Sequence, residues 1–463
     1  MIAAVFVLVL ALVIGVSSLM GGGAAVQVSQ SVPWWALMAV VLAFVAFFAG
    51  GVYIGAALAV LALLAGFGLS DRPFWNFIGE MLWAPSTNFV LVSVPLFLLM
   101  GEVMLRAGLS DRLYRALNVW VGRLPGGLLH TNIMACGVFS AIAGSSVATA
   151  ATMGSVALPY FEKSHYPPKL VLGSLAAGGA LGNLIPPGIT FIIYGLITET
   201  SVGALYLAAI GPSVLVVVLF LAVIFYYSIK LKISAENSTT LTLSAKLLSL
   251  IDLFPTLLLI GLVLGTIYAG WATPTEAAAL GALSVVVLAA CYGEMTWSAW
   301  VKSLEGALRI TVMSFLIIFG SATFAQILAF TGASSGLMNW ALSFELTPMG
   351  MLMIMLGMIL FLGCFMDQLS MMLLTAPIFF PLAKTLGFDL TWFGLIMLLA
   401  LEIGYTTPPF GLLLFVMKGV APPETTMKDI YLAAMPFIGC VLLLIAMIIV
   451  FPPLATWLPK LSH

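Results

Sequence analysis

The stretch "GNLIPPGITFIIYG", Gly182 to Gly195, places two consecutive prolines inside a long apolar run. A second stretch, "GYTTPPFGLLLFVMKG" from Gly404 to Gly419, repeats this arrangement near the other end of the chain. A proline inside a helix removes a backbone donor and clashes with the preceding turn, at a cost of about 3 kcal/mol. We therefore expect two of the most hydrophobic helices to be broken at these points.

The composition is that of a membrane protein. The chain has 463 residues, of which 63% are hydrophobic and only 7% are charged, and its mean hydropathy is +1.21. Soluble domains carry roughly 25% charged residues, and apolar runs of about 20 residues, typical of spanning helices, recur along the chain. The sequence predicts an all-α polytopic membrane protein, and its balanced charge gives no indication of a nucleic-acid partner.

The Cys and His residues do not indicate a metal site or disulfide bonds. The four cysteines are scattered without a CxxC pair, and the three histidines are isolated. We therefore expect neither a disulfide framework nor a transition-metal site, and no cofactor. The N-terminal apolar run lacks the basic region of a secretory signal, although the small residues after it leave cleavage open. We predict a retained additional helix within residues 1–32.

Matching spacings indicate an internal duplication. Two apolar stretches, 126–163 and 348–384, are interrupted by small and polar residues, so they fit poorly as single spans. Pro159 and Pro381 lie near their ends, and a proline pair follows each of them at the same spacing. One constant offset therefore relates Pro159 and its pair to Pro381 and its pair. The chain is predicted to contain two copies of a unit of about 220 residues, the kind of internal repeat found in transporters.

The distribution of Lys and Arg suggests the orientation, because short cytoplasmic loops are enriched in them. The basic loops alternate consistently only if each interrupted stretch enters and leaves on one side as a re-entrant hairpin. The resulting topology has about 11 transmembrane helices and two opposed re-entrant hairpins in inverted repeats. Its predicted segments are the additional helix (1–32), repeat 1 (33–246) with hairpin 126–163 and broken helix 170–197, repeat 2 (247–452) with hairpin 348–384 and broken helix 391–417, and a tail (453–463).

Inverted repeats with discontinuous helices are the architecture of secondary transporters. Lipid does not tolerate broken backbone, which survives only where it faces protein or an aqueous cavity. There, free carbonyls coordinate Na⁺ and half-helix N-termini attract anions. A simple proline kink is the alternative, but two pairs in register with two hairpins favour a site. We predict substrate and ion contacts at the breaks from Gly182, Asn183, Ile185, Pro186, Pro187, Glu402, Gly404, Thr406, Thr407, Pro408 and Pro409.

The hairpin tips are expected to hold the cation. In the first hairpin the candidates are Gly144, Ser145, Ser146 and Thr149, whose carbonyls and hydroxyls suit a hard cation. Close helix packing by small residues is the alternative. In the second hairpin the candidates are Asp367, Ser370 and Thr375. A carboxylate in apolar surroundings suggests function, and Asp367 is a candidate ion ligand, electrostatic support for a cation or helix cap.

Three other acids lie in apolar surroundings, and each is interpreted separately. Ion-site support and structural hydrogen bonding are equally compatible with Glu402. Glu102 is expected to pair with Arg106, one turn away. The sequence Thr273-Pro274-Thr275-Glu276 is typical of a helix N-terminus, with proline at the first position and an acid in the first turn.

The motifs "GSSVATAATMGSVALP", "LGSLAAGGALGNLIPPG", "TPTEAAALGAL" and "LEIGYTTPPFGLLLFV" together resemble the large membrane subunit of tripartite ATP-independent periplasmic (TRAP) transporters. The resemblance covers about residues 33 to 451, with motifs in order in both halves. The family's GSS hairpin tip falls on Gly144, Ser145 and Ser146. Its IPP and TPP breaks fall on the two proline pairs, and its acidic second-hairpin position falls on Asp367. The family commonly has serine where this chain has Gly188, so a hydroxyl that could contact ion or substrate is missing there.

The resemblance implies an elevator-type importer of the bacterial inner membrane that uses a Na⁺ gradient to take up an organic acid. It further implies two partners, a small four-helix membrane subunit and a periplasmic substrate-binding protein, in addition to the surrounding lipid. Dicarboxylate, sugar acid, keto acid and sulfonate substrates all remain open. The closest alternative is a stand-alone Na⁺-coupled anion symporter of the same superfamily. An intramembrane enzyme is disfavoured because HExxH, GxSxG and GxGD are absent, and matched repeats argue against a channel.

Overall fold

The computed structural model describes residues 42–43, 46–47, 50, 52–69, 78–164, 166–233, 243–330, 333–408 and 411–461. The additional helix predicted within residues 1–32 lies outside these residues, and so does Pro409 of the second proline pair. Within the described ranges every regular element is a helix, which confirms the all-α class.

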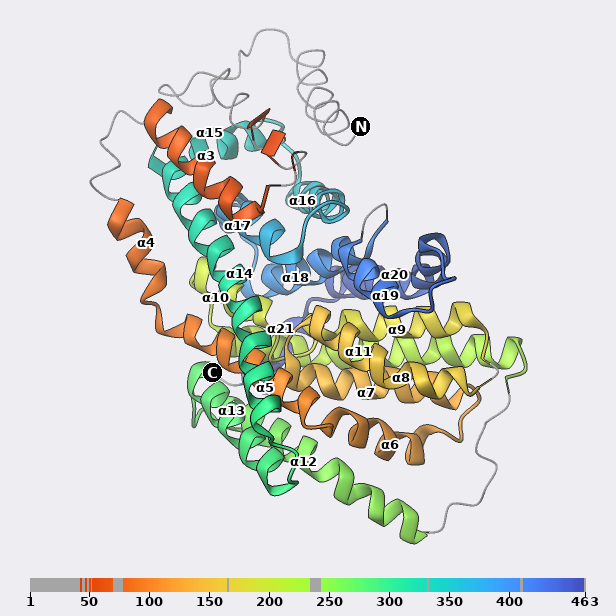
Figure 1. Ribbon diagram of the computed structural model, residues 1–463. Coiled ribbons are helices and arrows are strands. Elements are labelled where there is room, and N and C mark those ends of the chain that lie inside the picture. The colour runs from red at the N-terminus through yellow and green to blue at the C-terminus, as the bar shows by residue number, and fades with distance from the viewer. Residues whose placement is uncertain are drawn as a thin grey trace. The chain divides into compact units, whose positions relative to one another are not determined.

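In chain order the helices are α3 (Ile54–Leu69), α4 (Ile78–Ser86), the 3₁₀ helix η2 (Phe89–Val92), α5 (Ser93–Arg106), α6 (Leu109–Val121), α7 (Gly127–Ala143), α8 (Ser146–Glu162), α9 (Pro168–Leu184), α10 (Ile189–Thr198), α11 (Val202–Lys230), α12 (Leu243–Tyr268), α13 (Pro274–Cys291), α14 (Trp297–Phe330), α15 (Ala333–Leu342), α16 (Pro348–Gly363), α17 (Gln368–Thr385), α18 (Leu390–Thr406), α19 (Leu412–Val420), α20 (Met427–Val450) and α21 (Pro453–Leu461). Figure 1 follows them from red to blue.

Many of these helices are long and apolar enough to cross a bilayer. In the part of the chain that the structure describes, seven segments meet this criterion by length and composition. They are Phe89–Arg106, Pro168–Thr198, Val202–Lys230, Lys246–Tyr268, Pro274–Cys291, Trp297–Ile327 and Met427–Val450. Shorter apolar helices add Gly55–Gly66, Gly127–Ala143, Pro348–Gly363 and Leu390–Thr406. The chain is a multi-pass membrane protein, whereas eleven spans and their inversion stay a prediction.

The chain forms two compact units. Unit 1 comprises residues 1–88, 312–355 and 369–387, and unit 2 comprises residues 89–311, 356–368 and 388–463. Three helices, α14, α16 and α17, contribute residues to both units. The predicted division at residues 33, 247 and 453 follows the sequence repeat rather than compactness, so these units do not test it.

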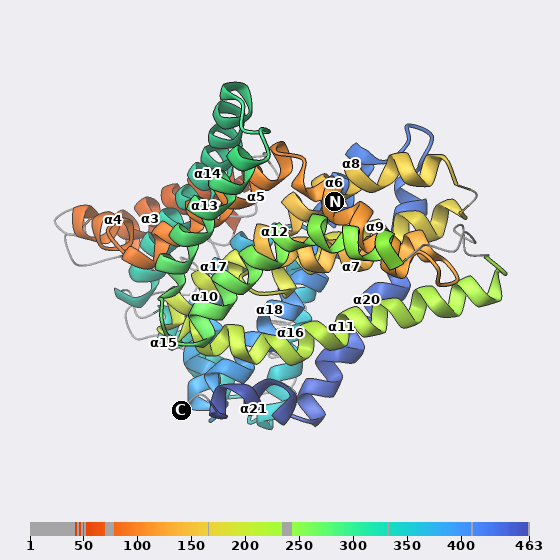
Figure 2. The same cartoon turned by 90° about the horizontal axis from the view of Figure 1, so that it is seen from below.

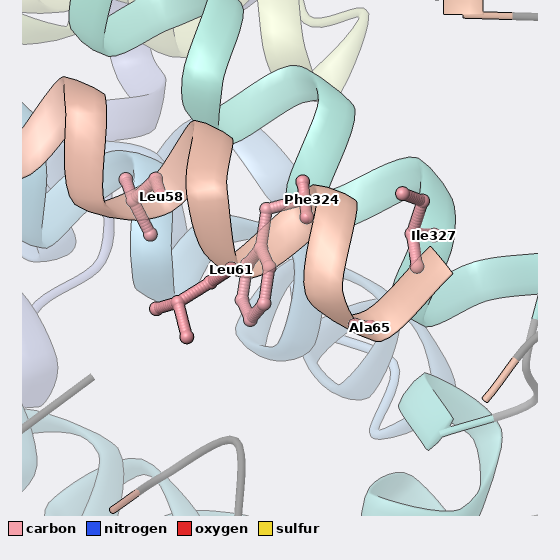
Figure 3. Packing of buried hydrophobic residues seen from close by; sticks show 6 residues of the cluster. Leu58, Leu61, Ala65, Phe324 and Ile327 are labelled. Atoms are coloured by element: carbon pink, nitrogen blue, oxygen red, sulfur yellow. The ribbon is translucent and has the colours of Figure 1, made fainter. Parts of the chain in front are cut away.

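The core of unit 1 is a contact between α3 and α14. Leu58, Leu61 and Ala65 of α3 are buried with Phe324 and Ile327 of α14 (Figure 3). A Cβ on Gly320 would lie only 2.4 Å from the carbonyl oxygen of Gly55, so the two helices cross with their backbones almost touching. This close crossing requires glycine, because any side chain would push the helices apart.

Unit 2 contains the two helices of the first predicted hairpin. Helices α7 and α8 pack against each other and both pack against α9, as Figure 1 shows. The long helix α11 packs against α20 and α21 (Figure 2). Helices α7 and α9 are buried along nearly their whole length. This burial places the first break inside protein.

Helix boundaries repeat with the offset seen in the sequence. Helices α9 and α18 each have 17 residues, and both ends of α18 follow those of α9 at the offset that relates the proline pairs. The starts of α8 and α17 are related in the same way. The C-cap of each broken helix, Ile185 or Thr407, directly precedes its proline pair and has an extended backbone. The prolines therefore end the helices as expected.

Two local predictions are confirmed. Arg106 Nε lies 3.6 Å from Glu102 Oε2, one turn away on α5. Thr273 is the N-cap of α13: its hydroxyl accepts a hydrogen bond from the Glu276 amide, and the Glu276 carboxylate accepts one from the Thr273 amide. This capping box satisfies two backbone donors at the helix start, which accounts for Glu276 without a functional role.

Candidate functional site

The tip of the first hairpin is a two-residue turn between α7 and α8. Gly144 adopts a left-handed conformation with φ 58°, and a Cβ there would lie 2.5 Å from the Pro187 carbonyl oxygen. The Ser145 hydroxyl then caps α8 by accepting a hydrogen bond of 3.4 Å from the Ala148 amide. The Gly144 carbonyl accepts one of 3.0 Å from the Ile189 amide. The tip is thus attached directly to the first break.

The first break separates α9 from α10. Ile185 is extended, with φ −94° and ψ 124°, and the Pro186–Pro187 peptide bond is cis. A Cβ on Gly182 would lie 2.5 Å from the carbonyl oxygen of Ser145 and from the amide nitrogen of Ser146. Only glycine lets the end of α9 come this close to the hairpin tip. The sequence-predicted residues 144–146 and 182–187 are therefore neighbours in space.

The second break, between α18 and α19, is built in a similar way. Thr407 is extended, with φ −93° and ψ 135°, and the chain resumes as a helix after Gly411. The hydroxyls of Thr406 and Thr407 donate back to the Ile403 carbonyl at 2.9 and 2.6 Å, which leaves their oxygens able to accept. The Cys364 thiol donates to the Pro408 carbonyl at 3.2 Å. The end of α16 thus lies against this break.

Four polar side chains, three of them buried and one partly buried, are joined by hydrogen bonds next to the breaks, and we call them the polar cluster. They are Ser146, Asn183, Gln368 and Glu402. The Ser146 hydroxyl donates a hydrogen bond of 2.9 Å to Glu402 Oε1. It also accepts a hydrogen bond of 3.1 Å from the backbone N–H of Asn183. The Asn183 side chain donates to Gln368 Oε1 at 2.5 Å. All four residues belong to unit 2, and Ser146, Gln368 and Glu402 are at most 4% exposed.

Some atoms of this region have no protein partner among the described residues. Glu402 Oε2 and Gln368 Nε2 are buried without a hydrogen bond, and so is the hydroxyl of Thr149. An unsatisfied buried polar group costs about 1–3 kcal/mol. Such groups are candidates for contact with an ion, a water molecule or a substrate.

The remaining predicted residues lie on or next to α17. Asp367 directly precedes this helix, at its N-cap position, and is partly exposed. Ser370 and Thr375 are buried and belong to unit 1, and the Thr375 hydroxyl donates to the Met371 carbonyl at 2.7 Å. These two residues are therefore described apart from the polar cluster.

Gln368 is the functional candidate that the sequence interpretation missed. The signal was available, because the offset between the proline pairs also relates Ser146 to Gln368, and both are the first residues of their helices. Asp367 is the more conspicuous candidate in the sequence, because it is a carboxylate in an apolar run whereas Gln368 is neutral. The sequence allows either an ion-site or a structural role for Glu402, and its place in the polar cluster is compatible with both.

No described group of three or more His, Cys, Asp or Glu residues could hold a metal ion. The three ion pairs in the described ranges involve Glu102, Asp111 and Asp252 as acids, and none involves the polar cluster. The donors near the tips and breaks are hydroxyl, amide, carbonyl and carboxylate oxygens, which are the ligands of hard cations.

Apolar helices long enough to cross a membrane, two of which break beside polar helix ends, are typical of membrane transport proteins. The fold is similar to that of the Alcanivorax borkumensis YdaH transporter, with a TM-score of 0.60 and 17% identity, covering 91% of this chain and 100% of that one. The family model of the tripartite ATP-independent periplasmic transporter, DctM component, matches residues 41–454. The chain belongs to this family, as the resemblance indicated.

Several relatives match this chain over most of their length, and two of them are described here. The C4-dicarboxylate TRAP transporter large permease protein DctM of Pseudomonas aeruginosa is 35% identical, over 82% of this chain and 88% of that permease. The sialic acid TRAP transporter large permease protein SiaM of Vibrio cholerae is 31% identical, over 87% of this chain and 93% of that permease. The protein is therefore a transporter component rather than an enzyme, and a multi-pass protein of the bacterial inner membrane that works within a tripartite system.

Proposed function

We propose that this chain is the transmembrane transport subunit of a Na⁺-coupled importer that takes up an organic acid delivered by a periplasmic binding protein. The observation that carries the proposal is the meeting of two proline-broken helices with polar hairpin tips in unit 2. Freed carbonyls and hydroxyls offer cation ligands there, and half-helix ends offer anion ligands. A symporter that carries an anion together with Na⁺ needs both cation ligands and anion ligands.

One cation is expected at each hairpin tip. Ser145, Ser146 and Thr149 offer hydroxyl oxygens around the first tip, and the buried Thr149 hydroxyl has no partner among the described residues. Asp367 offers a carboxylate just before α17. Oxygen ligands with few acids suit a monovalent hard cation, because a divalent ion normally draws several carboxylates. We assign this role to Na⁺.

The substrate is expected to carry a carboxylate. C4-dicarboxylates and sialic acid, the substrates named for the two relatives, are both organic acids. Neither Lys nor Arg belongs to the polar cluster, so the anion would be held by backbone amides, helix ends and hydroxyls. The Thr190 hydroxyl, buried without a described partner in the first turn of α10, is one such donor. The binding protein would supply most of the selectivity.

The chain would act with two other proteins. A small four-helix membrane subunit would complete the membrane part, and the binding protein would deliver substrate from the periplasm. Transport would follow an elevator mechanism, in which the domain carrying the hairpins moves the enclosed site across the membrane. Alternating access of this kind is the usual use of inverted repeats.

Uptake into proteoliposomes tests the proposal. The chain is reconstituted with its small membrane subunit, and its binding protein is added outside with the radiolabelled organic acid that this binding protein binds. We expect uptake under an inward Na⁺ gradient and little uptake when choline replaces Na⁺. Equal uptake under both gradients would contradict Na⁺ coupling. Na⁺-driven uptake that needs no binding protein would identify a stand-alone symporter instead.

A further inference from the structure

The polar cluster connects the two halves of the duplicated chain in a reciprocal way. Ser146, the first residue of α8, donates to Glu402 of the second broken helix at 2.9 Å. Gln368, the first residue of α17, accepts from the side chain of Asn183 in the first broken helix at 2.5 Å. Each hairpin is thus bonded to the broken helix of the opposite half. We call these two hydrogen bonds the cross-links.

Contacts within each half bring backbones close together. In the first half, a Cβ on Gly182 would lie 2.5 Å from Ser146 Cα, and the backbone N–H of Asn183 donates to the Ser146 hydroxyl. In the second half a Cβ on Gly363, at the end of α16, would lie 2.3 Å from Gly404 Cα. These glycine contacts fix each tip against its own break, but they carry nothing from one half to the other.

The cross-links are linked to each other. The backbone N–H of Asn183 donates to the Ser146 hydroxyl, and the side-chain NH₂ of Asn183 donates to Gln368 Oε1. One residue therefore holds both hairpins. The side chains of Gln368 and Asn183 also lie beside the Glu402 carboxylate. Because three of the four side chains are buried, these bonds lie in an environment of lowered dielectric constant, where hydrogen bonds are stronger and depend on one another. Displacing one tip would break bonds of the other.

We propose that the cross-links couple the two hairpin tips, so that ordering one tip by a bound cation raises the affinity of the other tip for its cation. The inference rests on the proposed Na⁺ sites and adds that they are not independent. Coupling between sites is reciprocal and typically amounts to about 5–150-fold in affinity. Na⁺ dependence of transport is then cooperative, and Gln368 is a positioning residue that maintains this cooperativity.

The test measures uptake of the radiolabelled organic acid by the complete reconstituted complex. The Na⁺ concentration is varied at constant ionic strength. Gln368→Met keeps the length of the side chain but removes the acceptor for Asn183. We expect a Hill coefficient above 1 in the parent to fall toward 1, and the half-saturating Na⁺ concentration to rise about 5-fold or more. The maximal rate at saturating Na⁺ should change much less.

Ser174→Ala is the matched control. It removes a buried bond of the same kind, in which the Asn132 side chain donates to the Ser174 hydroxyl between α7 and α9. Asn132 lies in the first half of α7, about three helical turns before the tip end of that helix at Ala143. This variant should retain the Hill coefficient. Where Gln368→Met fails to fold, Gln368→Asn serves instead, because it preserves polarity but is too short to reach Asn183.

A second readout uses no substrate. Thermal unfolding of the purified complex is followed against Na⁺, since a bound ion raises the midpoint by mass action. An unchanged Hill coefficient in Gln368→Met, or an equal loss in Ser174→Ala, would overturn the coupling while leaving Na⁺-driven transport intact. If neither uptake nor the unfolding midpoint of the parent complex depended on Na⁺, the proposed function would be overturned, and the coupling with it.

Discussion

The Ser146 hydroxyl donates a hydrogen bond of 2.9 Å to Glu402 Oε1 across 256 positions of the chain. Both residues are fully buried, at 0% and 1% exposure. Ser146 begins the second helix of one hairpin, and Glu402 lies one turn before the break of the opposite half. The carboxylate therefore holds in place the tip that is predicted to bind a cation.

Removing the carboxylate should destabilise the protein and disorder this tip. In Glu402→Ala the Ser146 hydroxyl loses its acceptor inside the protein, and the truncated side chain leaves a cavity. The unsatisfied hydroxyl alone costs about 1–3 kcal/mol. We expect a lower unfolding midpoint in detergent and uptake reduced at least several-fold. Glu402→Gln keeps an acceptor and should lose much less stability. Equal losses in both variants would show that the negative charge matters rather than the hydrogen bond.

Gly182→Ala should impair transport by steric conflict. The new Cβ would lie 2.5 Å from backbone atoms of Ser145 and Ser146, which cannot rotate away as a side chain could. Overpacking of this kind costs about 1–3 kcal/mol. We expect α9 and the first hairpin tip to separate and uptake to fall strongly. The control is Gly439→Ala on α20, where a Cβ meets nothing within 4 Å and better helix propensity should preserve stability. Similar uptake in both variants would contradict the close approach.

Local features could be predicted from the sequence because they depend on neighbouring residues. The proline pairs end α9 and α18 at equivalent positions, since proline disfavours a helical conformation in the residue before it. Glu102 and Arg106 pair because they are one helical turn apart. Thr273 caps α13 because its hydroxyl lies three residues from the Glu276 amide.

Long-range contacts could not be predicted in this way. Ser146 and Glu402 are 256 positions apart, and no helical or repeat spacing in the sequence relates them. Their hydrogen bond is therefore seen only in the packed structure. Gln368 was missed for a related reason, since its role depends on the side chain of Asn183 at a distance of 185 positions. The offset between the two halves pointed to equivalent positions, but not to which equivalent residues meet partners from the other half.

The capping box of α13 is expected to contribute stability without affecting transport. In Thr273→Ala the Glu276 amide loses its side-chain acceptor and the helix start frays. We expect the unfolding midpoint in detergent to fall by a few degrees, while the Na⁺ concentration that half-saturates uptake stays the same. Thr426→Ala, which removes the equivalent box at the start of α20, should behave alike. A changed Na⁺ dependence in Thr273→Ala would give Glu276 a role that its capping geometry does not suggest.

Asp367→Asn tests the acid at the second tip. Asp367 lies directly before α17, where a carboxylate can bind a cation or complement the positive end of the helix. Asparagine remains a good N-cap, so a purely structural role predicts normal Na⁺-dependent uptake. A role in cation binding predicts a half-saturating Na⁺ concentration at least several-fold higher, with the unfolding midpoint in Na⁺-free buffer unchanged. We expect the second result, because this partly exposed carboxylate is the only acid among the proposed cation ligands. Unchanged Na⁺ dependence would reassign Asp367 to helix capping.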